Sequence, residues 1–416
     1  MGGVSVSGAS VSEVGADVLL ARAYLSRVSE PANIPVWDLV RRVGPVAAVA
    51  AIRDGSAGRS VIAATAARRD SGDPFADLDA ADRSGVRLVV PESAQWPHFA
   101  FAALERTGQT RAAEYQAGRH THSESGEPIP PLALWVRGPA ELASVGVRSV
   151  GIVGSRAATS YGESVTADLA YGLARREVVV VSGGAYGIDA AAHRAALVAD
   201  GTTVLVSAGG LDRPYPPGNA ALFERVADTG LLVSESPPGC APQRRRFLTR
   251  NRLIAALSTG VVVVEAASRS GASNTAKHAV VLQRPLMAVP GPVTSAMSAG
   301  CHNLIRDQQA LLVGTVDDVL AVVGSIGEGI DLGASDEPKV AEGDVRAELD
   351  RLDPLGRRVF DGLFARRFAR PDEIAVRGGV SPLEVIRALP TLELAGLIES
   401  SDGGYRIAGR LRAKPA

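Results

Sequence analysis

Residues 149–198 read SVGIVGSRAATSYGESVTADLAYGLARREVVVVSGGAYGIDAAAHRAALV, and this stretch decides the fold. It holds two apolar runs, SVGIV (149–153) and VVVVS (178–182), and each precedes a Gly-containing turn and a helical segment. Continuous Val/Ile runs are typical of strands buried on both faces, as in parallel sheets covered by helices. The stretch therefore predicts two consecutive βα units.

Four further apolar runs extend this pattern over residues 132–323. They are TVLVS (203–207), LLVSE (231–235), VVVVE (261–265) and LMAVP (286–290). Six βα-type units predict an α/β domain with a doubly wound, Rossmann-like parallel sheet. Ligands of such sheets bind at the carboxyl ends of the strands, so a site is expected in the loops that follow these runs.

Nearly every one of these loops is rich in Gly and Ser. Three of them contain GSR (154–156), SGG (182–184) and SGAS (270–273). Such loops let backbone N–H groups and helix N-termini face an anion. We therefore expect a phosphate-contacting surface along this edge, and Ser270, Gly271 and Ser273 are taken as part of it.

The loops do not match the two common nucleotide-binding fingerprints. A nicotinamide site needs G-x-G-x-x-G and an acid after the second strand, where this chain has SGG (182–184). A P-loop needs a lysine, and the domain has none before Lys277. No cofactor is therefore expected. His193 and His278 are expected in core or capping roles, and Asp189 is expected to cap the helix at 190.

The densest positive charge lies in QRRRFLTRNR (243–252), at the start of a helix expected to reach Ser258. Arg binds phosphate in bidentate fashion and Phe offers a face for base stacking, so this composition favours single-stranded nucleic acid. Two or three of the five arginines are expected to touch it, and others to pair with acids such as Glu235 or Glu265. The segment adds Arg244, Arg245, Arg246, Phe247, Arg250, Asn251 and Arg252 to the candidate site.

Together these segments resemble the bacterial DNA-processing protein A family, DprA, also called Smf. The resemblance lies in GIVGSR (151–156), VVSGGAYGIDAAAH (180–193), AGGLDRPYPPGN (208–219), VSESPPG (233–239), FLTRNRLIAALS (247–258), VVEAASRSGASNTA (263–276) and VPGPVTSAMSAGCHNLI (289–305). It implies a non-enzymatic protein that binds single-stranded DNA, forms homodimers through the α/β domain, protects incoming DNA in natural transformation and helps to load the RecA recombinase.

The resemblance also implies where DNA binds. The implied contacts are Ser155, Arg156, Gly183, Gly184, Phe247, Arg250 and Asn251. A basic residue often precedes the family's Phe, and which of Arg244 to Arg246 corresponds to it is left open. One departure is Asp307-Gln308-Gln309-Ala310, where the family usually has Asp-Gly-Ala, so a turn there is expected to differ.

The flanking regions have patterns of their own. Residues 1–83 predict a small helical module, of the SAM or helix-hairpin-helix kind, with helices over 16–28 and 46–52. Residues 84–131 predict a connecting strand over 86–90 and a polar surface insertion over 105–131. Residues 324–344 are a Gly-rich acidic linker. Residues 345–416 predict a winged helix, with helices over 345–364, from 370 and from 381, and a hairpin around 403–404.

Composition sets the broad class of the chain. Its 416 residues carry a formal net charge of -1, which excludes a globally basic coat protein. The two cysteines, Cys240 and Cys301, are too few for a disulfide framework and indicate a reducing cytoplasm. Neither a signal peptide nor a membrane span is expected. His120 and His122 are expected in a solvated loop, because no third metal ligand lies near them.

Two alternatives remain beside a DNA-binding mediator. A nucleotide hydrolase or phosphoribohydrolase on a related Rossmann-like fold would carry a P-G-G-x-G-T-x-x-E loop, of which residues 182–189 are a distant echo. A sequence-specific repressor would use the winged helix. Its presumed recognition helix, 382–394, has one arginine, Arg387, against two glutamates, so a protein-interaction or stability role is favoured there.

Overall fold

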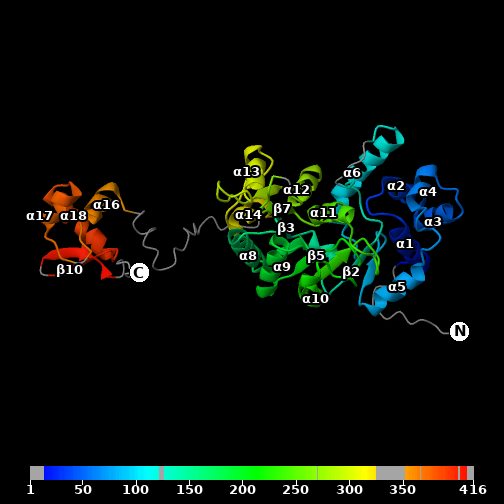
Figure 1. The fold of residues 1–416 in the computed structure, drawn as a ribbon, viewed down its shortest axis with the longest axis horizontal. Coiled ribbons are helices and arrows are strands. Elements are labelled where there is room, and N and C mark those ends of the chain that lie inside the picture. The colour runs from blue at the N-terminus through cyan, green and yellow to red at the C-terminus, as the bar shows by residue number, and fades with distance from the viewer. Residues whose placement is uncertain are drawn as a thin grey trace. The chain divides into compact units, whose positions relative to one another are not determined.

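The computed structural model describes residues 14–120, 126–268, 270–324, 352–365, 367–401 and 403–409 (Figure 1). The chain divides into two compact units, residues 1–328 and residues 329–416. Within the described residues, the first unit contains a nine-stranded sheet and the second a two-stranded sheet. In neither unit do the described residues include a helix that is long and apolar enough to cross a membrane.

The large sheet confirms the expected doubly wound architecture. Its order is β1-β2-β6-β5-β4-β3-β7-β8-β9, and all neighbours from β6 to β9 pair in parallel. The antiparallel strands β1 and β2 extend one edge. The strands are β1 (Arg87–Val89), β2 (Leu134–Arg137), β3 (Ser149–Val153), β4 (Val179–Gly183), β5 (Thr203–Val206), β6 (Leu231–Ser234), β7 (Gly260–Val263), β8 (Leu286–Ala288) and β9 (Leu311–Leu312).

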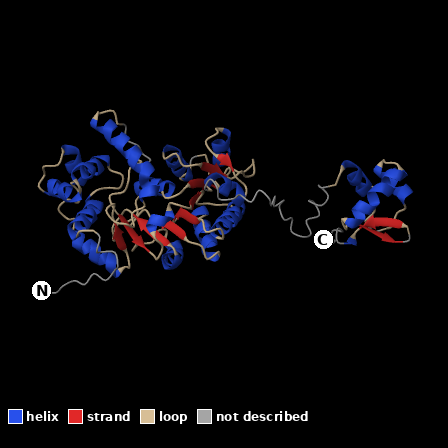
Figure 2. Cartoon of the chain, turned by 180° about the vertical axis from the view of Figure 1, so that it is seen from behind, coloured by secondary structure: helices blue, strands red, loops and turns tan. Residues whose placement is uncertain are grey.

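Helices cover both faces of this sheet (Figures 1 and 2). Val261 and Val263 of β7 pack against the helices of one face, and Val262 packs against those of the other, because alternate side chains of a strand point to opposite faces. One face carries α6 (His98–Gln116), α7 (Leu142–Val145), α11 (Arg244–Ala256) and α12 (Ala272–Val281). The other carries α8 (Ser160–Ala174), α9 (Ile188–Val198), α10 (Ala220–Thr229) and α14 (Val316–Val323). A 3-10 turn (Pro217–Asn219) and α13 (Ala299–Arg306) complete this part.

The direction of winding reverses between β3 and β7. From β3 the chain runs through α8, α9 and α10 to β6 on one side, and α11 then returns it to β7 on the opposite side of β3. Such a switch point leaves a crevice at the carboxyl ends of the two strands. The loops after β3 and β7 meet there, where Thr159 donates two hydrogen bonds to the Glu265 carboxylate.

The N-terminal helices lie beside the antiparallel edge of the sheet. They are α1 (Ala16–Val28), α2 (Ile34–Val43), α3 (Pro45–Arg53), α4 (Arg59–Thr65) and α5 (Pro74–Arg83). The expected helix over 16–28 is confirmed, and the turn before α3 is made by Gly44, whose φ of 81° disfavours other residues. The Trp135 indole of β2 donates to Ser26 Oγ at 3.2 Å. The helical module and the sheet therefore belong to one compact unit.

The segment 105–131 is a surface insertion only in part: residues 116–119 are exposed, as expected, whereas its last residues are not. Helix α6 continues to Gln116, and residues 126–131 are buried. Gly126 lies against α11 so closely that a Cβ there would be 2.8 Å from Thr249 Cα. The His120 side chain is 3% exposed and lies 3.2 Å from Glu127, so the expectation of a solvated His120 is wrong. His122 lies outside the described residues.

Over its described residues, the second unit has three helices and a hairpin, the elements of a winged helix. Its elements are α16 (Pro354–Asp361), α17 (Pro371–Gly378), α18 (Pro382–Leu394), β10 (Ile398–Ser401) and β11 (Gly404–Ile407). Ser381 and Glu384 form the expected capping box. The first helix differs from the prediction over 345–364. It begins at Pro354 because Asp353 is extended and caps it, as the residue before a proline prefers; residues 345–351 lie outside the described residues.

The segment Asp307-Gln308-Gln309-Ala310, where the sequence departs from the family's usual Asp-Gly-Ala, contains a residue with a positive φ. Gln308 follows α13 with a φ of 55°, in the left-handed region where glycine is the usual residue. A glutamine therefore occupies a left-handed backbone conformation that glycine adopts more readily.

Candidate nucleic-acid interface

The first Gly-rich loop is held by the loop that precedes α9. The Ile188 N–H donates to Ser155 O at 3.2 Å. Gly187 has a φ of 73°, and a Cβ on it would collide with the carbonyl oxygens of Ser155 and Arg156. Ser155 Oγ accepts from the Ala157 N–H at 3.1 Å. These contacts fix the backbone of the loop and leave the Arg156 side chain exposed.

The second Gly-rich loop makes room for a guanidinium group. A Cβ on Gly183 would come within 2.5 Å of Arg250 Nη1 and of Asp189 Oδ2. A Cβ on Gly184 would meet the Phe223 ring at 2.5 Å. Both glycines are therefore required by close packing, and the first of them lets α11 place Arg250 beside the loop.

Arg250 and Asp189 are both buried beneath the surface of the site, where they interact electrostatically. Arg250 donates to the carbonyl oxygen of Val206 and, at 3.2 Å, to Asn251 Oδ1. Burial lowers the pKa of Arg250 to about 10, although Asp189 acts to raise it. Burial also raises the pKa of Asp189, against the opposing effects of Arg250 and the Ala185 N–H. Arg250 remains charged at neutral pH.

The expected capping role of Asp189 is wrong. Helix α9 begins at Ile188 with Gly187 as its N-cap, so Asp189 lies in the first turn and interacts with Arg250. Neither the Asp189–Arg250 pair nor the Val206 carbonyl could be found from the sequence, because the groups come from distant segments.

An aromatic and cationic cluster lies at the surface of this site. The Arg156 guanidinium carbon is 5.3 Å from the centroid of the half-buried Phe247 ring. On the same ring, the Tyr215 ring lies 5.5 Å away between centroids, with the two planes 54° apart. The structure thus brings Arg156 and Phe247 together as the sequence predicted. Sequence reasoning missed Tyr215, although the motif AGGLDRPYPPGN placed an aromatic in a strand-end loop.

The loop after β7 and the start of α12 lie next to α11. Asn251 Nδ2 donates to Asn274 Oδ1 at 3.0 Å, which joins the two helices. The hydroxyls of Ser270 and Ser273 are 3.3 Å apart, and Gly271 is exposed. The candidate residues of this loop therefore share an edge with Asn251, which is itself buried.

The arginines of 243–252 divide into exposed and internally paired groups. Arg244 and Arg245 are exposed at the start of α11. Arg252 is 0% exposed and donates to both carboxylate oxygens of Glu235, at 2.5 and 2.7 Å, and to Ile129 O at 2.9 Å. The prediction of a DNA contact by Arg252 is therefore wrong, whereas the expected pairing with Glu235 is confirmed.

Arg246 is held by the helical module. It donates to the two carboxylate oxygens of Glu30 at 2.8 and 3.0 Å and to Ala241 O at 3.0 Å, so its predicted DNA contact is also inconsistent with its place. Burial acts to raise the pKa of Glu30, but Arg246 and Arg68 outweigh it and lower the pKa to about 2. Glu265, the other acid expected to pair with an arginine, accepts from Thr159 instead.

The histidines of the α/β domain are internal. His193 is fully buried, with Nδ1 2.7 Å from Thr203 Oγ1 and Nε2 2.8 Å from Gly183 O. Burial lowers the pKa of His193 to about 4, so its ring is neutral near pH 7. His278 is buried in α12. Among the residues described, no three His, Cys, Asp or Glu side chains gather as a metal site would require.

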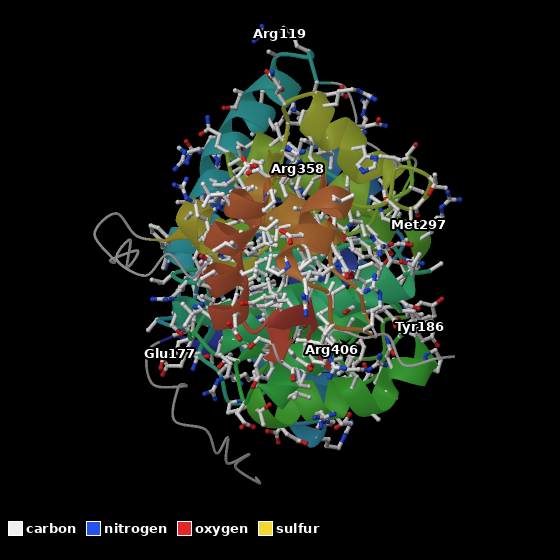
Figure 3. All side chains as sticks on the ribbon, turned by 90° about the vertical axis from the view of Figure 1, so that its left-hand side faces the viewer. Arg119, Glu177, Tyr186, Met297, Arg358 and Arg406 are labelled. Carbon is white, nitrogen blue, oxygen red and sulfur yellow. The ribbon has the colours of Figure 1, made fainter. Side chains whose placement is uncertain are left out.

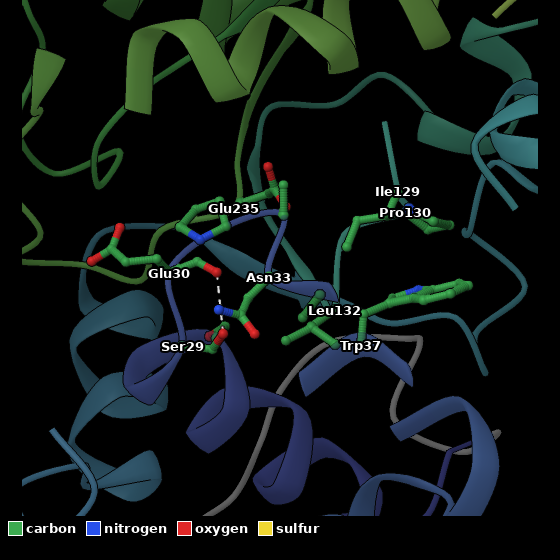
Figure 4. A pocket seen from close by; sticks show the side chains of 12 residues that line it. Ser29, Glu30, Asn33, Trp37, Ile129, Pro130, Leu132 and Glu235 are labelled. Carbon is green, nitrogen blue, oxygen red and sulfur yellow. Dashed lines mark hydrogen bonds between the residues drawn. The ribbon is translucent and has the colours of Figure 1, made fainter. Parts of the chain in front are cut away.

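A small cavity marks the junction between the helical module and the sheet (Figure 4). Its volume is about 20 Å³, and Glu30, Asn33, Trp37, Ile129 and Glu235 are among its lining residues. The two glutamates are the partners of Arg246 and Arg252. The junction therefore carries the acids that anchor α11.

The fold and this site define a protein with a doubly wound α/β domain, whose carboxyl edge is cationic and aromatic, and a winged helix later in the chain. The chain belongs to the DNA recombination-mediator protein A family, DprA or Smf, whose members are DNA-processing proteins. The family model matches residues 119–324, and the model of the DprA winged helix domain matches residues 346–404.

Similar proteins cover different shares of the chain. The chain is 50% identical over 400 residues to a putative DNA processing protein DprA of Mycobacterium tuberculosis, spanning 95% of this chain and 97% of that protein. It is 40% identical over 190 residues to DNA processing protein DprA of Bacillus subtilis, spanning 46% and 63%. An X-ray structure of DNA processing protein A from Streptococcus pneumoniae aligns with a TM-score of 0.59 and 29% identity, covering 75% of this chain and 99% of that one.

Proposed function

We propose that the protein binds single-stranded DNA, without chemical change to it, along the carboxyl edge of the large sheet. The observation that carries this proposal is the convergence of Arg156, from the loop after β3, with Phe247 and Arg250, both from α11, at that edge. An exposed guanidinium beside an aromatic ring offers a phosphate contact and a base-stacking face together. The binding of unpaired nucleotides needs both.

Each group has a distinct part in this proposal. Arg156 is free to turn from the Phe247 ring to a phosphate. Phe247 offers its ring to a base. Arg250 adds a fixed positive charge next to Gly183, which attracts phosphates over a short range because Asp189 offsets part of it. Exposed Arg244 and Arg245 extend the positive surface at the start of α11, while Ser270, Gly271 and Ser273 offer polar groups on the other side of Asn251.

The test is a gel-shift of the purified full chain on single- and double-stranded oligonucleotides of equal length. Tighter binding to the single strand, weakening as salt rises, is the expected result. Equal or tighter binding to the duplex would contradict the proposal. Arg176→Ala is the matched control, because Arg176 follows α8 and bonds Asp317 on the other face of the sheet.

The family resemblance supports three further parts of the proposed function. The protein forms homodimers, acts in the cytoplasm, and passes single-stranded DNA to the RecA recombinase. Sedimentation of the full chain at micromolar concentration tests the dimer, and a strict monomer contradicts it. Recombinase loading is tested by strand exchange on single strands, with Arg156→Ala as the variant expected to lose the stimulation.

The alternative of a nucleotide hydrolase is less well supported. Asp189, at the position that echoes the catalytic acid, is buried and interacts with Arg250 instead of facing an open site. Release of free base from nucleoside monophosphates by the wild-type protein, abolished in Asp189→Asn, would establish that activity in place of the one proposed.

A further inference from the structure

Tyr215 lies beside Phe247 at the edge of the sheet, and a second exposed tyrosine, Tyr186, lies in a neighbouring loop. Tyr215, in the loop between β5 and α10, is 46% exposed, and Tyr186, in the loop between β4 and α9, is 48% exposed. The Tyr186 hydroxyl lies against Gly218, where a Cβ would be 2.5 Å from it. Figure 3 shows Tyr186 at the border of the molecule. Two loops and the first turn of α11 therefore bring aromatic rings to the carboxyl edge of the sheet, in a chain that is only 4% aromatic.

The Tyr215 ring is not needed for the core. Among the described residues no hydrogen bond to its hydroxyl is found, 46% of the residue is exposed, and its ring contact is with the half-buried Phe247. An exposed aromatic ring next to a guanidinium is a common platform for a nucleobase.

We propose that Tyr215 is a second nucleobase platform beside Phe247, so that the site takes two successive bases that are not stacked on each other. This inference rests on the proposed binding of single-stranded DNA and specifies the form of DNA that fits. Arg156, 5.3 Å from the Phe247 ring, is placed to hold a phosphate next to the two bases.

The angle between the two rings favours single-stranded over double-stranded DNA. The planes of Tyr215 and Phe247 are 54° apart, so bases stacked on the two rings are tilted relative to each other by a similar angle. Successive bases of a duplex lie parallel, at a rise of about 3.4 Å per step. A duplex cannot bring two neighbouring bases onto both rings, whereas an unpaired strand splays its bases at little cost.

The number of bases that the site binds can be measured even if the position of the strand on the protein is not known. Oligonucleotides of constant length carry a central tract of zero to four thymines, and all other positions are abasic, so every oligonucleotide offers the same phosphates. For the full-length wild-type protein, the affinity should rise about 5- to 100-fold with each thymine that finds a ring. Tyr215→Ala should reach its plateau one thymine earlier than wild type, and Tyr215→Phe should behave as wild type.

Tyr171→Ala is the matched control. Tyr171 is 45% exposed in the last turn of α8, far along that helix from the edge where the loops meet, and its replacement should change nothing. An unchanged thymine dependence in Tyr215→Ala, with the variant folded by thermal melting, overturns the inference and leaves the proposed function intact. Failure of the wild type to bind any of these strands would instead refute the proposed function, and the inference with it.

Discussion

Three arginines that were all predicted to contact DNA have very different surroundings in the fold. Arg252 is enclosed with Glu235, Arg246 is tied to Glu30, and Arg156 is open to solvent beside Phe247. The guanidinium groups of Arg252 and Arg246 are buried and bonded to carboxylates within the protein, so they are not available to hydrogen-bond a phosphate of a ligand. The sequence shows that a guanidinium group is available at each position, but only the fold shows whether a carboxylate within the protein already binds it.

Arg252→Ala is expected to destabilise the fold by about 3–5 kcal/mol, because it leaves the Glu235 carboxylate buried without its partner. Equilibrium unfolding in urea measures the change. Arg244→Ala, at an exposed position eight residues earlier, should stay within about 0.5 kcal/mol of wild type. Comparable stability of the two variants would contradict the assigned ion pair.

Arg156→Ala should flatten the salt dependence of single-strand affinity by about 0.7 in the log–log slope, since it removes one phosphate contact. Phe247→Ala should weaken the binding free energy by about 1–3 kcal/mol. Its slope of log affinity against log salt should stay close to that of wild type, because stacking releases no counterion. Titrations at several salt concentrations separate the two effects. A sharp fall in the melting temperature of Phe247→Ala would show that the ring supports the fold instead.

His193 makes stability depend on pH. Its folded pKa of about 4 lies below the usual 6.5, so the unfolded chain takes up the proton first as the pH falls. This contribution is full above about pH 6.5 and is lost as the pH falls toward 4. Between pH 7 and pH 5, the free energy of unfolding should therefore fall by about 2 kcal/mol more for wild type than for His193→Gln. Parallel unfolding curves at the two pH values for both proteins would contradict it.

At the scale of elements, the strands were the most predictable part. Six runs of Val, Ile and Leu gave six parallel strands because both faces of that sheet are buried. Two strands were not predicted: β2 is an antiparallel strand outside the series of βα units, and β9 has only two residues, both exposed. The Glu30–Arg246 pair joins residues 216 positions apart, so no local pattern records it. Tyr215 was visible in the motif, but its approach to Phe247 depends on how two loops fold.

The turn after α13 offers a direct test of backbone strain. A left-handed conformation costs a residue with a Cβ about 1–2 kcal/mol, and glycine loses about 0.5–1 kcal/mol of this advantage through its freer unfolded state. Gln308→Gly is therefore expected to stabilise the protein by about 0.5–1 kcal/mol. Gln309→Gly, at the next and equally exposed position, should destabilise it by a similar amount. Thermal unfolding distinguishes the two signs.

At the scale of the whole molecule, the two units have different surfaces. The winged helix has its own core around Val359, Ile374 and Leu389. Its third helix exposes Leu383 and Ile386, at 60% and 55%, where a reader of the major groove would present hydrogen-bonding groups. The face is typical of a protein contact more than of a base contact.

A chain that ends at Gly343 is therefore expected to keep its affinity for single-stranded DNA within about threefold, which corresponds to less than 1 kcal/mol. The gel-shift used for the full chain measures it. Arg156→Ala in the shortened chain should weaken binding by the same factor as in the full chain. Loss of most single-strand affinity on truncation would assign the winged helix a direct part in binding.

Glu30 binds Arg246 of α11, and Gly126 packs against the side of the same helix. These contacts determine which parts of the chain unfold together. Amide protons of α11 exchange with solvent only when the helix separates from its neighbours, and the first helices of the chain are among those neighbours. Distant stretches of the chain thus share one opening event. Heat or denaturant would release the N-terminal helices and α11 together, as a single cooperative block.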